Sequence, residues 1–106
     1  MRVYCAGPYT SNPNKNTRIA IQVGAKLLAM GHHPFVPHAK SHLWDIVDDS
    51  MTWEKWMEYD LVWLAQCEAL IRIPGESKGA DLEVREARRL GIPVYYGLAQ
   101  FVHHGG

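Results

Sequence analysis

Short runs of strand-forming residues alternate with helical patterns along the whole chain, and this alternation restricts the fold more than any other feature. The strand-like runs are "RVYCAG" at 2–7, "HPFVPH" at 33–38, "CEALIRI" at 67–73 and "IPVYYG" at 92–97. Helical spacing covers 12–30, 52–66 and 80–91, with one or two helical turns within 39–50 and a last turn at 98–102. Such alternation predicts an α/β fold in which right-handed crossovers join a parallel sheet covered by helices on both faces. We expect a short flavodoxin-like three-layer sheet of strand order 2-1-3-4, in a single domain over residues 1–106.

The ends of the first helix and the position of the second strand follow from individual residues. Asn12 followed by Pro13 predicts an N-cap and a first-turn proline, and Gly31 predicts a C-terminal glycine. Apolar residues recur at helical spacing along this helix: Ile19, Val23, Leu27 and Met30, with Ala20, Gly24 and Leu28 beside them. The prolines of "HPFVPH" predict a strand at the edge of the sheet.

Charge and cysteine content exclude several classes of protein. Eleven basic and eleven acidic residues cancel, and no Lys/Arg block is present, so we expect no nucleic-acid polymer as a partner. Cys5 and Cys67 lie in apolar runs and are expected to be buried, reduced thiols rather than a disulfide. The first residues lack the apolar core of a signal peptide, and no apolar run reaches membrane-spanning length. We therefore expect a cytoplasmic protein that does not enter a membrane.

In a sheet of this order, ligands bind beyond the carboxyl ends of the strands, near the switch point between the first and third strands. Three loops lie at that edge: "GPYTSN" at 7–12, "PHAKSH" at 37–42 and "PGESKGADLE" at 74–83. We expect these loops to surround the functional site.

Glu83 is placed where an apolar residue is expected. It falls on the inward stripe of its helix, with Ala80, Ala87 and Leu90, and Val84 at the margin. Two neighbouring charges have partners on the same helix, Asp81 with Arg85 and Glu86 with Arg89, but Glu83 has none. The helix N-terminus stabilises a carboxylate by about 0.3–1 kcal/mol, which is less than the several kcal/mol that burial of a lone charge costs. Glu83 is therefore expected to line a cleft or to accept hydrogen bonds.

Asp60 repeats this anomaly on the preceding helix. It lies in the middle of an apolar side formed by Trp53, Trp56, Met57, Leu61 and Leu64. Aspartate is unfavourable in a helix interior because its side chain competes for backbone hydrogen bonds. A structural explanation is that Asp60 caps a loop or pairs with Arg72 or Lys78. Two inward carboxylates beside the same edge of the sheet instead favour a functional site.

Paired carboxylates suit chemistry at an acetal-type carbon, where one attacks the carbon or stabilises a cation-like centre and the other manages protons. The loop before Glu83 supplies hydrogen-bond donors. Ser77, Lys78 and the backbone amides at the helix start, including that of Gly79, predict an anion site suited to phosphate. This turn lacks the spacing of a Walker loop or of GxGxxG.

The sequence resembles the nucleoside 2-deoxyribosyltransferase-like family, which includes the 5′-nucleotide N-glycosidases. The resemblance rests on "VYCAGPYT", "FVPH", "YDLVWLAQCEALIRIP" and "SKGADLEVREARRLGIPVYY", in this order. It implies that Glu83 is a nucleophile attacking C1′ of the sugar and that Asp60 positions Glu83 and contacts the sugar. It also implies that Tyr4 and Gly7 flank the ribose.

The resemblance further implies that His38 lies near the substrate and that Ser77 contacts a phosphate. In the nucleotide N-glycosidases a serine and an arginine occupy the first loop, where this chain has Pro8 and Thr10. Tyr9 or Lys78 is expected to take over their contacts. Members of the family often complete the site with a neighbouring subunit, so we expect a homo-oligomer.

The expected function is therefore cleavage or transfer at the N-glycosidic bond of a (deoxy)nucleoside or its 5′-monophosphate. The alternative is a non-catalytic module that binds a nucleotide in the same pocket. No cofactor is expected. A metal site is not expected either, because no Cys or Glu completes a recognised pattern with the nearby histidines and Asp45.

Overall fold

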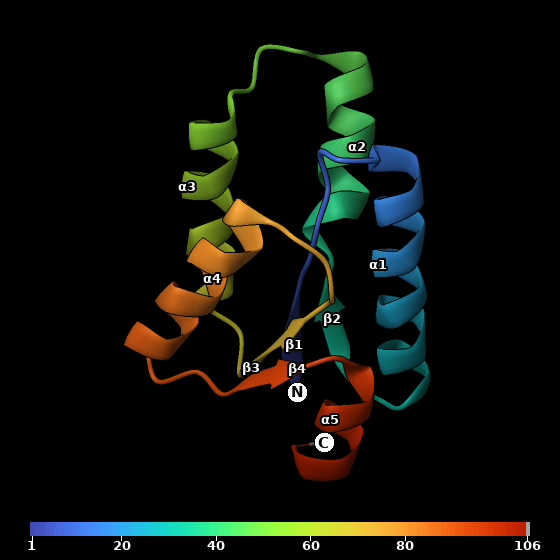
Figure 1. Ribbon diagram of the computed structural model, residues 1–106, viewed down its shortest axis with the longest axis vertical. Helices are drawn as coiled ribbons and strands as arrows, with labels where there is room; N and C mark the ends of the chain where they lie inside the picture. Colours follow the sequence, from blue (N-terminus) through green and yellow to red (C-terminus); the bar gives the residue numbers. More distant parts are fainter. Residues whose placement is uncertain (106) are drawn as a thin grey trace.

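Four parallel strands and five helices alternate along residues 1–105, the part of the chain that the computed structural model describes (Figure 1). The strands are β1 (Arg2–Ala6), β2 (His33–Phe35), β3 (Ala69–Arg72) and β4 (Val94–Tyr96). The helices are α1 (Pro13–Ala29), α2 (Pro37–Val47), α3 (Trp53–Leu64), α4 (Lys78–Arg89) and α5 (Leu98–His104). The sheet order is β2-β1-β3-β4, with every pair parallel, so the predicted flavodoxin-like order is confirmed.

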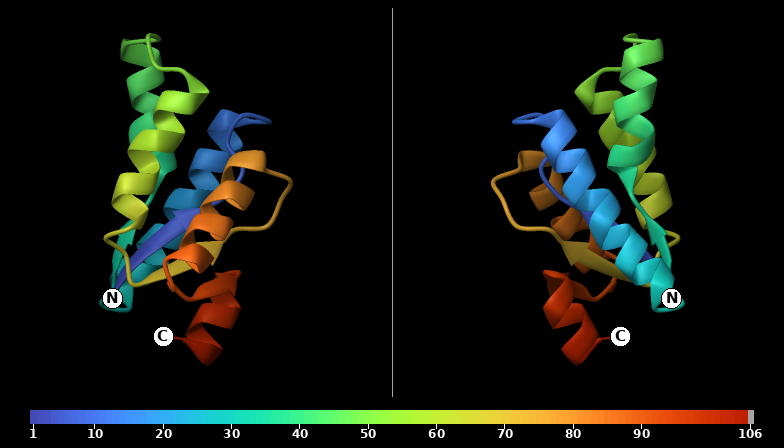
Figure 2. Two further views of the ribbon diagram at one scale, coloured as in Figure 1. Left: turned by 90° about the vertical axis from the view of Figure 1, so that its left-hand side faces the viewer. Right: turned by 90° about the vertical axis from the view of Figure 1, so that its right-hand side faces the viewer.

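Two layers of helices cover the sheet, and alternate residues of each strand face opposite layers. Val3 and Cys5 of β1 pack with Leu27 of α1 and Phe101 of α5. Tyr4 and Ala6 face the other way, toward α3 and α4; in Figure 2, α1 and α4 lie on opposite sides of the strands. We call these two sides the α1 face and the α4 face. The central strands β1 and β3 are buried on both sides, as expected for a parallel sheet, whereas the edge strands β2 and β4 are only partly buried.

Helix α1 begins and ends where the sequence predicts. The Asn12 side chain accepts a hydrogen bond from the backbone N–H of Lys15, Pro13 occupies the first turn, and Gly31 has a φ of +90°. The apolar pattern matches the buried side only in part: Ala20, Gly24 and Leu27 are buried together with Thr17, whereas Ile19, Leu28 and Met30 are exposed. The small residues allow close packing, since a Cβ added to Gly24 would lie 2.7 Å from Val36 Cγ2. Close approach of α1 to the sheet therefore decided which side of the helix is buried.

The segment after β2 differs most from its prediction. β2 ends at Phe35, and Pro37 and His38 belong to the first turn of α2, where a proline is favoured because its missing N–H has no partner there in any case. α2 continues to Val47 and is longer than the one or two turns expected within 39–50. Figure 1 shows α2 extending beyond the carboxyl end of the sheet. This helix adds a wall that the sequence did not reveal.

The two cysteines differ in burial. Cys5 is a buried free thiol whose pKa is raised to about 12, mainly by burial. Cys67 is also free but only half-buried, so the expectation that both are buried was wrong for Cys67, which lies just before β3. None of the helices within residues 1–105 combines the length and apolar character needed to cross a bilayer.

Candidate functional site

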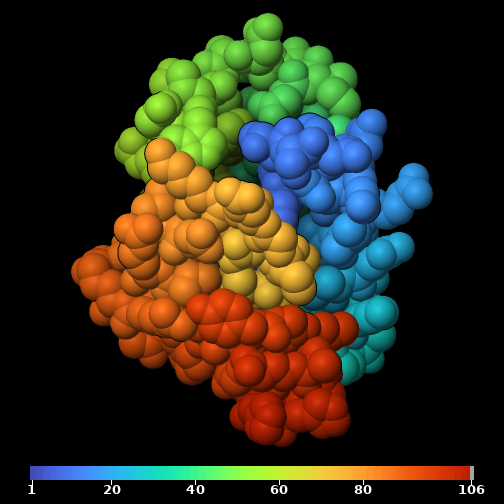
Figure 3. Space-filling model, viewed as in Figure 1, coloured from blue at the N-terminus to red at the C-terminus, as the bar shows by residue number. Residues whose placement is uncertain are grey.

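A cleft of about 690 Å³ opens beyond the carboxyl ends of β1, β2 and β3. All three loops expected at this edge contribute to it, together with α3. Part of its mouth is visible in Figure 3, where the segments coloured green, blue and yellow-orange meet. The predicted site residues that line the cleft are Gly7, Tyr9, His38, Asp60, Ser77, Lys78, Gly79 and Glu83. Its volume lies within the range of small-molecule sites.

Glu83 lies at the buried end of the cleft and is only 6% exposed. The Tyr4 hydroxyl donates a hydrogen bond to Glu83 Oε2, so Tyr4 meets Glu83 from below although it does not line the cleft itself. The Tyr4 ring is fully buried and stacks on Phe35, with ring centroids 5.5 Å apart. The prediction that Glu83 lines a cleft or accepts hydrogen bonds is confirmed on both counts.

The pKa of Glu83 is raised to about 8, mainly by burial. The Tyr4 hydrogen bond and the positive charges of Lys40 and Arg72 oppose this rise, while the negative charge of Asp60 adds to it. Burial also raises the pKa of Tyr4, with the charges of Glu83 and Asp60 adding to the effect. The Tyr4 phenol therefore stays protonated and acts as a donor, whereas Glu83 changes its protonation state near neutral pH.

Asp60 is as buried as Glu83, at 6% exposed, but has a cation beside it. Lys40 Nζ lies 2.6 Å from Asp60 Oδ1, so the expectation of Arg72 or Lys78 as partner was wrong. Lys40 comes from α2, whose extent the sequence did not reveal. Its ammonium group lies 4.2 Å from the Trp56 ring centroid and 4.8 Å from that of Tyr59, which holds it by cation–π attraction. Burial raises the pKa of Asp60, and Lys40 opposes this rise.

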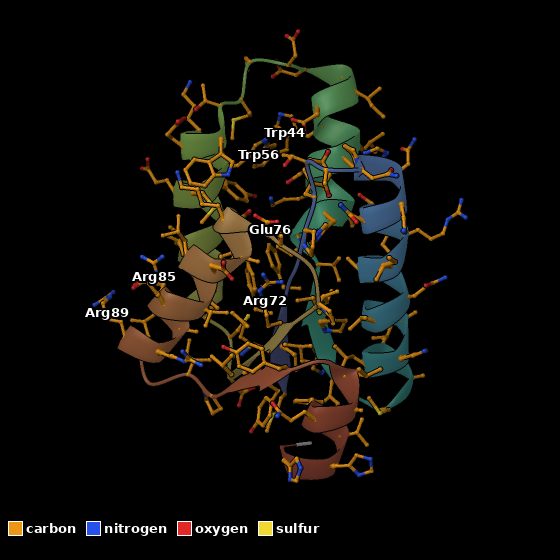
Figure 4. All side chains as sticks on the ribbon, viewed as in Figure 1. Trp44, Trp56, Arg72, Glu76, Arg85 and Arg89 are labelled. Atoms are coloured by element: carbon orange, nitrogen blue, oxygen red, sulfur yellow. The ribbon has the colours of Figure 1, made fainter. Side chains whose placement is uncertain are left out.

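Arg72 fixes the loop that leads into α4. From the end of β3 its guanidinium group donates to the carbonyl oxygens of Ile73 and Gly75, the latter at 2.8 Å, and to Asp81 Oδ1 at 3.0 Å. Asp81 therefore pairs with Arg72. The expected ion pair between Asp81 and Arg85 was wrong. In Figure 4, Arg85 points away from the molecule while Arg72 lies under the loop. Tertiary contact with a buried guanidinium replaced the expected pair within the helix.

Other predictions for α4 had mixed outcomes. Glu86 and Arg89 form the expected ion pair on the outer surface of the helix. Ala80, Val84 and Ala87 are buried with Glu83, but Leu90 is exposed because it lies at the C-cap, beyond the part of the helix that covers the sheet.

Two glycines allow the loops to approach closely at the end of the sheet. Gly75 has a φ of +125°, and a Cβ added to it would lie 2.6 Å from Pro8 Cγ. A Cβ on Gly7 would lie 2.9 Å from Ile73 Cβ. Both positions thus need glycine for space, and Gly75 needs it for its backbone conformation as well. The loops after β1 and β3 are held against each other.

The start of α4 supplies the donors expected there. Ser77 is the N-cap residue, and its hydroxyl oxygen accepts a hydrogen bond from the Ala80 N–H at 3.1 Å. Its own O–H is therefore available for a ligand. Lys78 Nζ lies 5.3 Å from the Trp53 ring centroid. This end of α4 combines a hydroxyl, an ammonium group and the positive end of a helix dipole at the cleft.

His38 and Tyr9 lie on the opposite side of the cleft, on α2 and on the loop after β1. His38 Nε2 lies 2.8 Å from the Pro8 carbonyl oxygen, and its Nδ1 is buried without a hydrogen-bond partner within the described residues. Burial lowers the pKa of His38, which favours the neutral imidazole. The Tyr9 hydroxyl donates to Asp45 Oδ2 at 3.2 Å.

Sequence reasoning did not identify Lys40 and Asp45 as residues of the site. It also did not predict that Trp56 contacts both of them. Trp56 Nε1 donates to Asp45 Oδ1 at 3.2 Å, and the rings of Trp44 and Trp56 meet between α2 and α3 (Figure 4). One feature of the sequence could have indicated Asp45. If Pro37 is taken as the first residue of a helix, Ser41 and Asp45 follow at intervals of four and lie on the same side of that helix.

The histidines do not gather at one place. His38 and His42 both lie on α2 near Tyr9, whereas His32 contacts the N-terminal amino group and packs against Phe101. Across residues 1–105, no three side chains of His, Cys, Asp or Glu are grouped as a metal site requires.

Comparison with known proteins places this fold and cleft in a family. A search of curated proteins found no match to the chain. A family described as "Domain of unknown function (DUF4406)" matches residues 1–96, which include all four strands and the whole of the cleft lining. The chain therefore belongs to the DUF4406 family.

Proposed function

We propose that the protein cleaves or transfers the N-glycosidic bond of a (deoxy)nucleoside or a nucleoside 5′-monophosphate, with Glu83 as the nucleophile. The observation that carries this proposal is the burial of Glu83 at the end of an open cleft, with Asp60 beside it and Tyr4 donating to it. A buried carboxylate costs stability, and such a cost is typical of functional sites. The resemblance to the nucleoside 2-deoxyribosyltransferase-like proteins supports this substrate class.

The reaction takes two displacement steps. A Glu83 carboxylate oxygen forms a bond to C1′ while the bond from C1′ to the base nitrogen breaks, and its electron pair leaves with the base. The base takes up a proton from water or a nearby group, and Asp60 helps to position that donor. Water, or a second base, then attacks C1′ and gives up a proton to the group that protonated the first base, while Glu83 leaves as a carboxylate. Two displacements retain the configuration at C1′.

The neighbours of Glu83 have distinct roles in this scheme. The Tyr4 hydrogen bond fixes the orientation of the carboxylate without supplying a charge. The Asp60 carboxylate opposes ionisation of Glu83 in the free protein, but it stabilises the positive charge that develops on the sugar. Lys40 holds Asp60 in place and lowers its pKa, which favours the ionised form. Because Glu83 has a pKa of about 8, base release by the free protein should increase with pH through that value.

We propose further that the substrate carries a 5′-phosphate, which binds at the start of α4. Ser77 O–H, Lys78 Nζ and the N-terminus of α4 form an anion site on the same helix as Glu83, less than two turns before it. A 5′-phosphate there would bring the sugar to the carboxylate.

The expected homo-oligomer remains a prediction that analytical ultracentrifugation tests directly.

One observation favours the second function, a module that binds a nucleotide without chemistry. With a pKa of about 8, Glu83 is mostly protonated at neutral pH, and a neutral carboxyl group binds hydroxyls well but does not attack carbon. Such a module would bind the same ligands in the same cleft.

Incubation of the purified protein with deoxynucleosides and their 5′-monophosphates, with chromatography of the free base, separates the two functions. We expect base release from at least one substrate between about pH 7 and pH 9, matching a group of pKa about 8. Binding detected by calorimetry without any base release would favour the module and contradict the enzyme.

Variants of one helix test the nucleophile. Glu83→Ala and Glu83→Gln should both lower the rate of base release by at least about a thousandfold, because the covalent step is lost. Glu86→Gln is the matched control, since Glu86 pairs with Arg89 on the outer surface of α4. Equal activity of Glu83→Gln and Glu86→Gln would refute the mechanism.

A further inference from the structure

Asp45 is a carboxylate of the cleft that the proposed reaction does not use. It lines the cleft from α2, and two donors hold it: the Tyr9 hydroxyl on Oδ2 and the Trp56 indole N–H on Oδ1, each at 3.2 Å. No lysine or arginine within residues 1–105 forms an ion pair with it. A carboxylate oxygen has more than one lone pair, so both oxygens can still accept a further hydrogen bond. Asp45 is thus a fixed acceptor without a counter-ion.

Contacts between α2 and α3 locate Asp45 relative to the buried carboxylates. Lys40 of α2 meets Asp60 of α3, while Asp45 of α2 meets Trp56 of α3. The two helices therefore run in opposite directions across the cleft. The Asp45–Trp56 pair lies about 6–7.5 Å farther along them than the Lys40–Asp60 pair, at 1.5 Å per helical residue. Asp45 is therefore a little more than one helical turn beyond Asp60.

The anion site and Asp45 belong to different walls of the cleft. Ser77 and Lys78 come from the start of α4, whereas Asp45 comes from α2 and is tied to Tyr9. A nucleoside carries its base and its 5′ group on opposite sides of the ring oxygen. A sugar held over Glu83 with its 5′ group toward Ser77 therefore directs its base toward the wall formed by α2, where the Tyr9 and Trp56 rings offer aromatic surface.

We propose that Asp45 determines base specificity by accepting a hydrogen bond from an exocyclic amino group, so that the cleft takes cytosine or adenine in preference to uracil, thymine or hypoxanthine. This inference rests on the proposed function for the class of substrate. Carboxylates accept from the amino group of cytosine in other recognition sites. Uracil and hypoxanthine present a carbonyl oxygen at the same ring position, which places two acceptors against each other. A site built around one hydrogen bond rejects the analogue that lacks it.

The test is equilibrium binding in the Glu83→Gln protein, in which turnover is removed and tryptophan fluorescence reports on Trp53 and Trp56 at the cleft. The probes are the matched pairs dCMP with dUMP and dAMP with dIMP. The amino member of each pair should bind roughly tenfold more tightly or better, which is the discrimination expected of one good hydrogen bond to a base. Equal affinity within both pairs, or a preference for the keto members, would overturn the inference.

Asp45→Asn keeps the shape of the side chain but introduces a donor that can meet a carbonyl oxygen. The ratio of affinities within each pair should fall toward one or reverse. Asp49→Asn is the matched control, because it removes the same charge from the lining of the same cleft and should leave the ratio unchanged. An unchanged ratio in Asp45→Asn contradicts the inference, and circular dichroism establishes that the variant is folded.

The outcomes for the two proposals are distinguishable. Preferential binding of amino bases without base release by the wild-type protein supports the role of Asp45 and contradicts the proposed enzymatic function. Base release without discrimination within the pairs supports the proposed enzymatic function and contradicts the role of Asp45 in base specificity. Absence of binding by all four nucleotides overturns the role of Asp45 whatever else the protein does.

Discussion

The two faces of the sheet have the same construction, a layer of helices packed on parallel strands, but only one of them buries ionisable side chains of opposite charge. On the α1 face the buried polar residue of the covering helix is Thr17, and the rest of the packing is apolar. On the α4 face, the buried ionisable side chains at the carboxyl end of the strands are Tyr4, Asp60, Glu83 and the oppositely charged Arg72. Tyr4 and Cys5 are neighbours in β1, yet only Tyr4 has a partner at a cleft.

This difference shows what marks a site in a fold of this kind. A buried polar group alone is not informative, because Thr17 is buried and its hydroxyl has no hydrogen-bond partner within residues 1–105, yet it does not line the cleft. Glu83 differs because its burial is combined with an open cleft, a donor beneath it and a second carboxylate beside it. Packing explains the α1 face, whereas the α4 face carries a cost that packing does not require.

The largest expected effect is on stability as a function of pH. Glu83 has a pKa of about 4.5 when unfolded and about 8 when folded, so its contribution is fully present below pH 4.5 and is lost as the pH rises through 8. Glu83→Gln removes this loss. From about pH 4 to about pH 9, the free energy of unfolding of the variant should increase relative to the wild type by on the order of 4 kcal/mol, measured by urea denaturation.

The matching change on the α1 face is Thr17→Val. It removes a buried hydroxyl without a partner and should increase stability by about 1 kcal/mol at every pH, because nothing titrates. A pH-independent gain for Glu83→Gln as well would show that the two faces do not differ in the way described.

The second effect concerns Lys40, the cation of the α4 face. Lys40→Met should slow base release near neutral pH by about 10- to 100-fold, because loss of the positive charge raises the pKa of both Asp60 and Glu83 and leaves less carboxylate. The acid limb of the pH–rate profile should move to higher pH. Lys40→Arg keeps the charge and should return the limb toward its original position. A slower rate with an unmoved limb would reduce Lys40 to a packing role.

The third effect tests whether Ser77 contacts a phosphate. Ser77→Asp preserves the N-cap of α4 but places a negative charge in the proposed anion site. The KM for 5′-monophosphates should increase about tenfold or more, through like-charge repulsion, while the KM for free nucleosides stays close to its original value. Ser77→Ala separates the cap from the charge, since it should lower stability by about 1 kcal/mol. Equal changes for both kinds of substrate would exclude a phosphate contact.

The smallest effect compares two glycines at opposite ends of α4. Gly75 and Gly91 both have positive φ, but only Gly75 would bring a Cβ against another residue, Pro8. Gly91→Ala should lower stability by about 1–2 kcal/mol from backbone strain alone. Gly75→Ala should cost roughly 1 kcal/mol more, through overpacking against Pro8. Thermal denaturation measures both, and an equal loss would show that the loops after β1 and β3 separate easily.

Local sequence signals predicted the strands and three of the helices, because those features depend on nearby residues. The strand order followed from the general rules for crossover connections in parallel sheets. Asn12, Pro13 and Gly31 act within a few residues of the helix ends that they determine. The positions of Glu83 and Asp60 were readable for the same reason, since a carboxylate on an apolar stripe is visible from helical spacing alone. Partners distant in sequence were not readable. Lys40 is 20 positions from Asp60, and Arg72 rather than the nearby Arg85 pairs with Asp81.

The sequence by itself therefore determined the α/β order of elements and singled out two misplaced carboxylates, because hydrophobic periodicity and end signals are local. Only the tertiary structure decided that Tyr4 of β1 reaches Glu83 of α4, that α2 brings Lys40 to Asp60, and that Asp45 is fixed by Tyr9 and Trp56. Such contacts join segments that only chain crossovers bring together. Their geometry depends on how closely helices pack on strands, which no local pattern encodes.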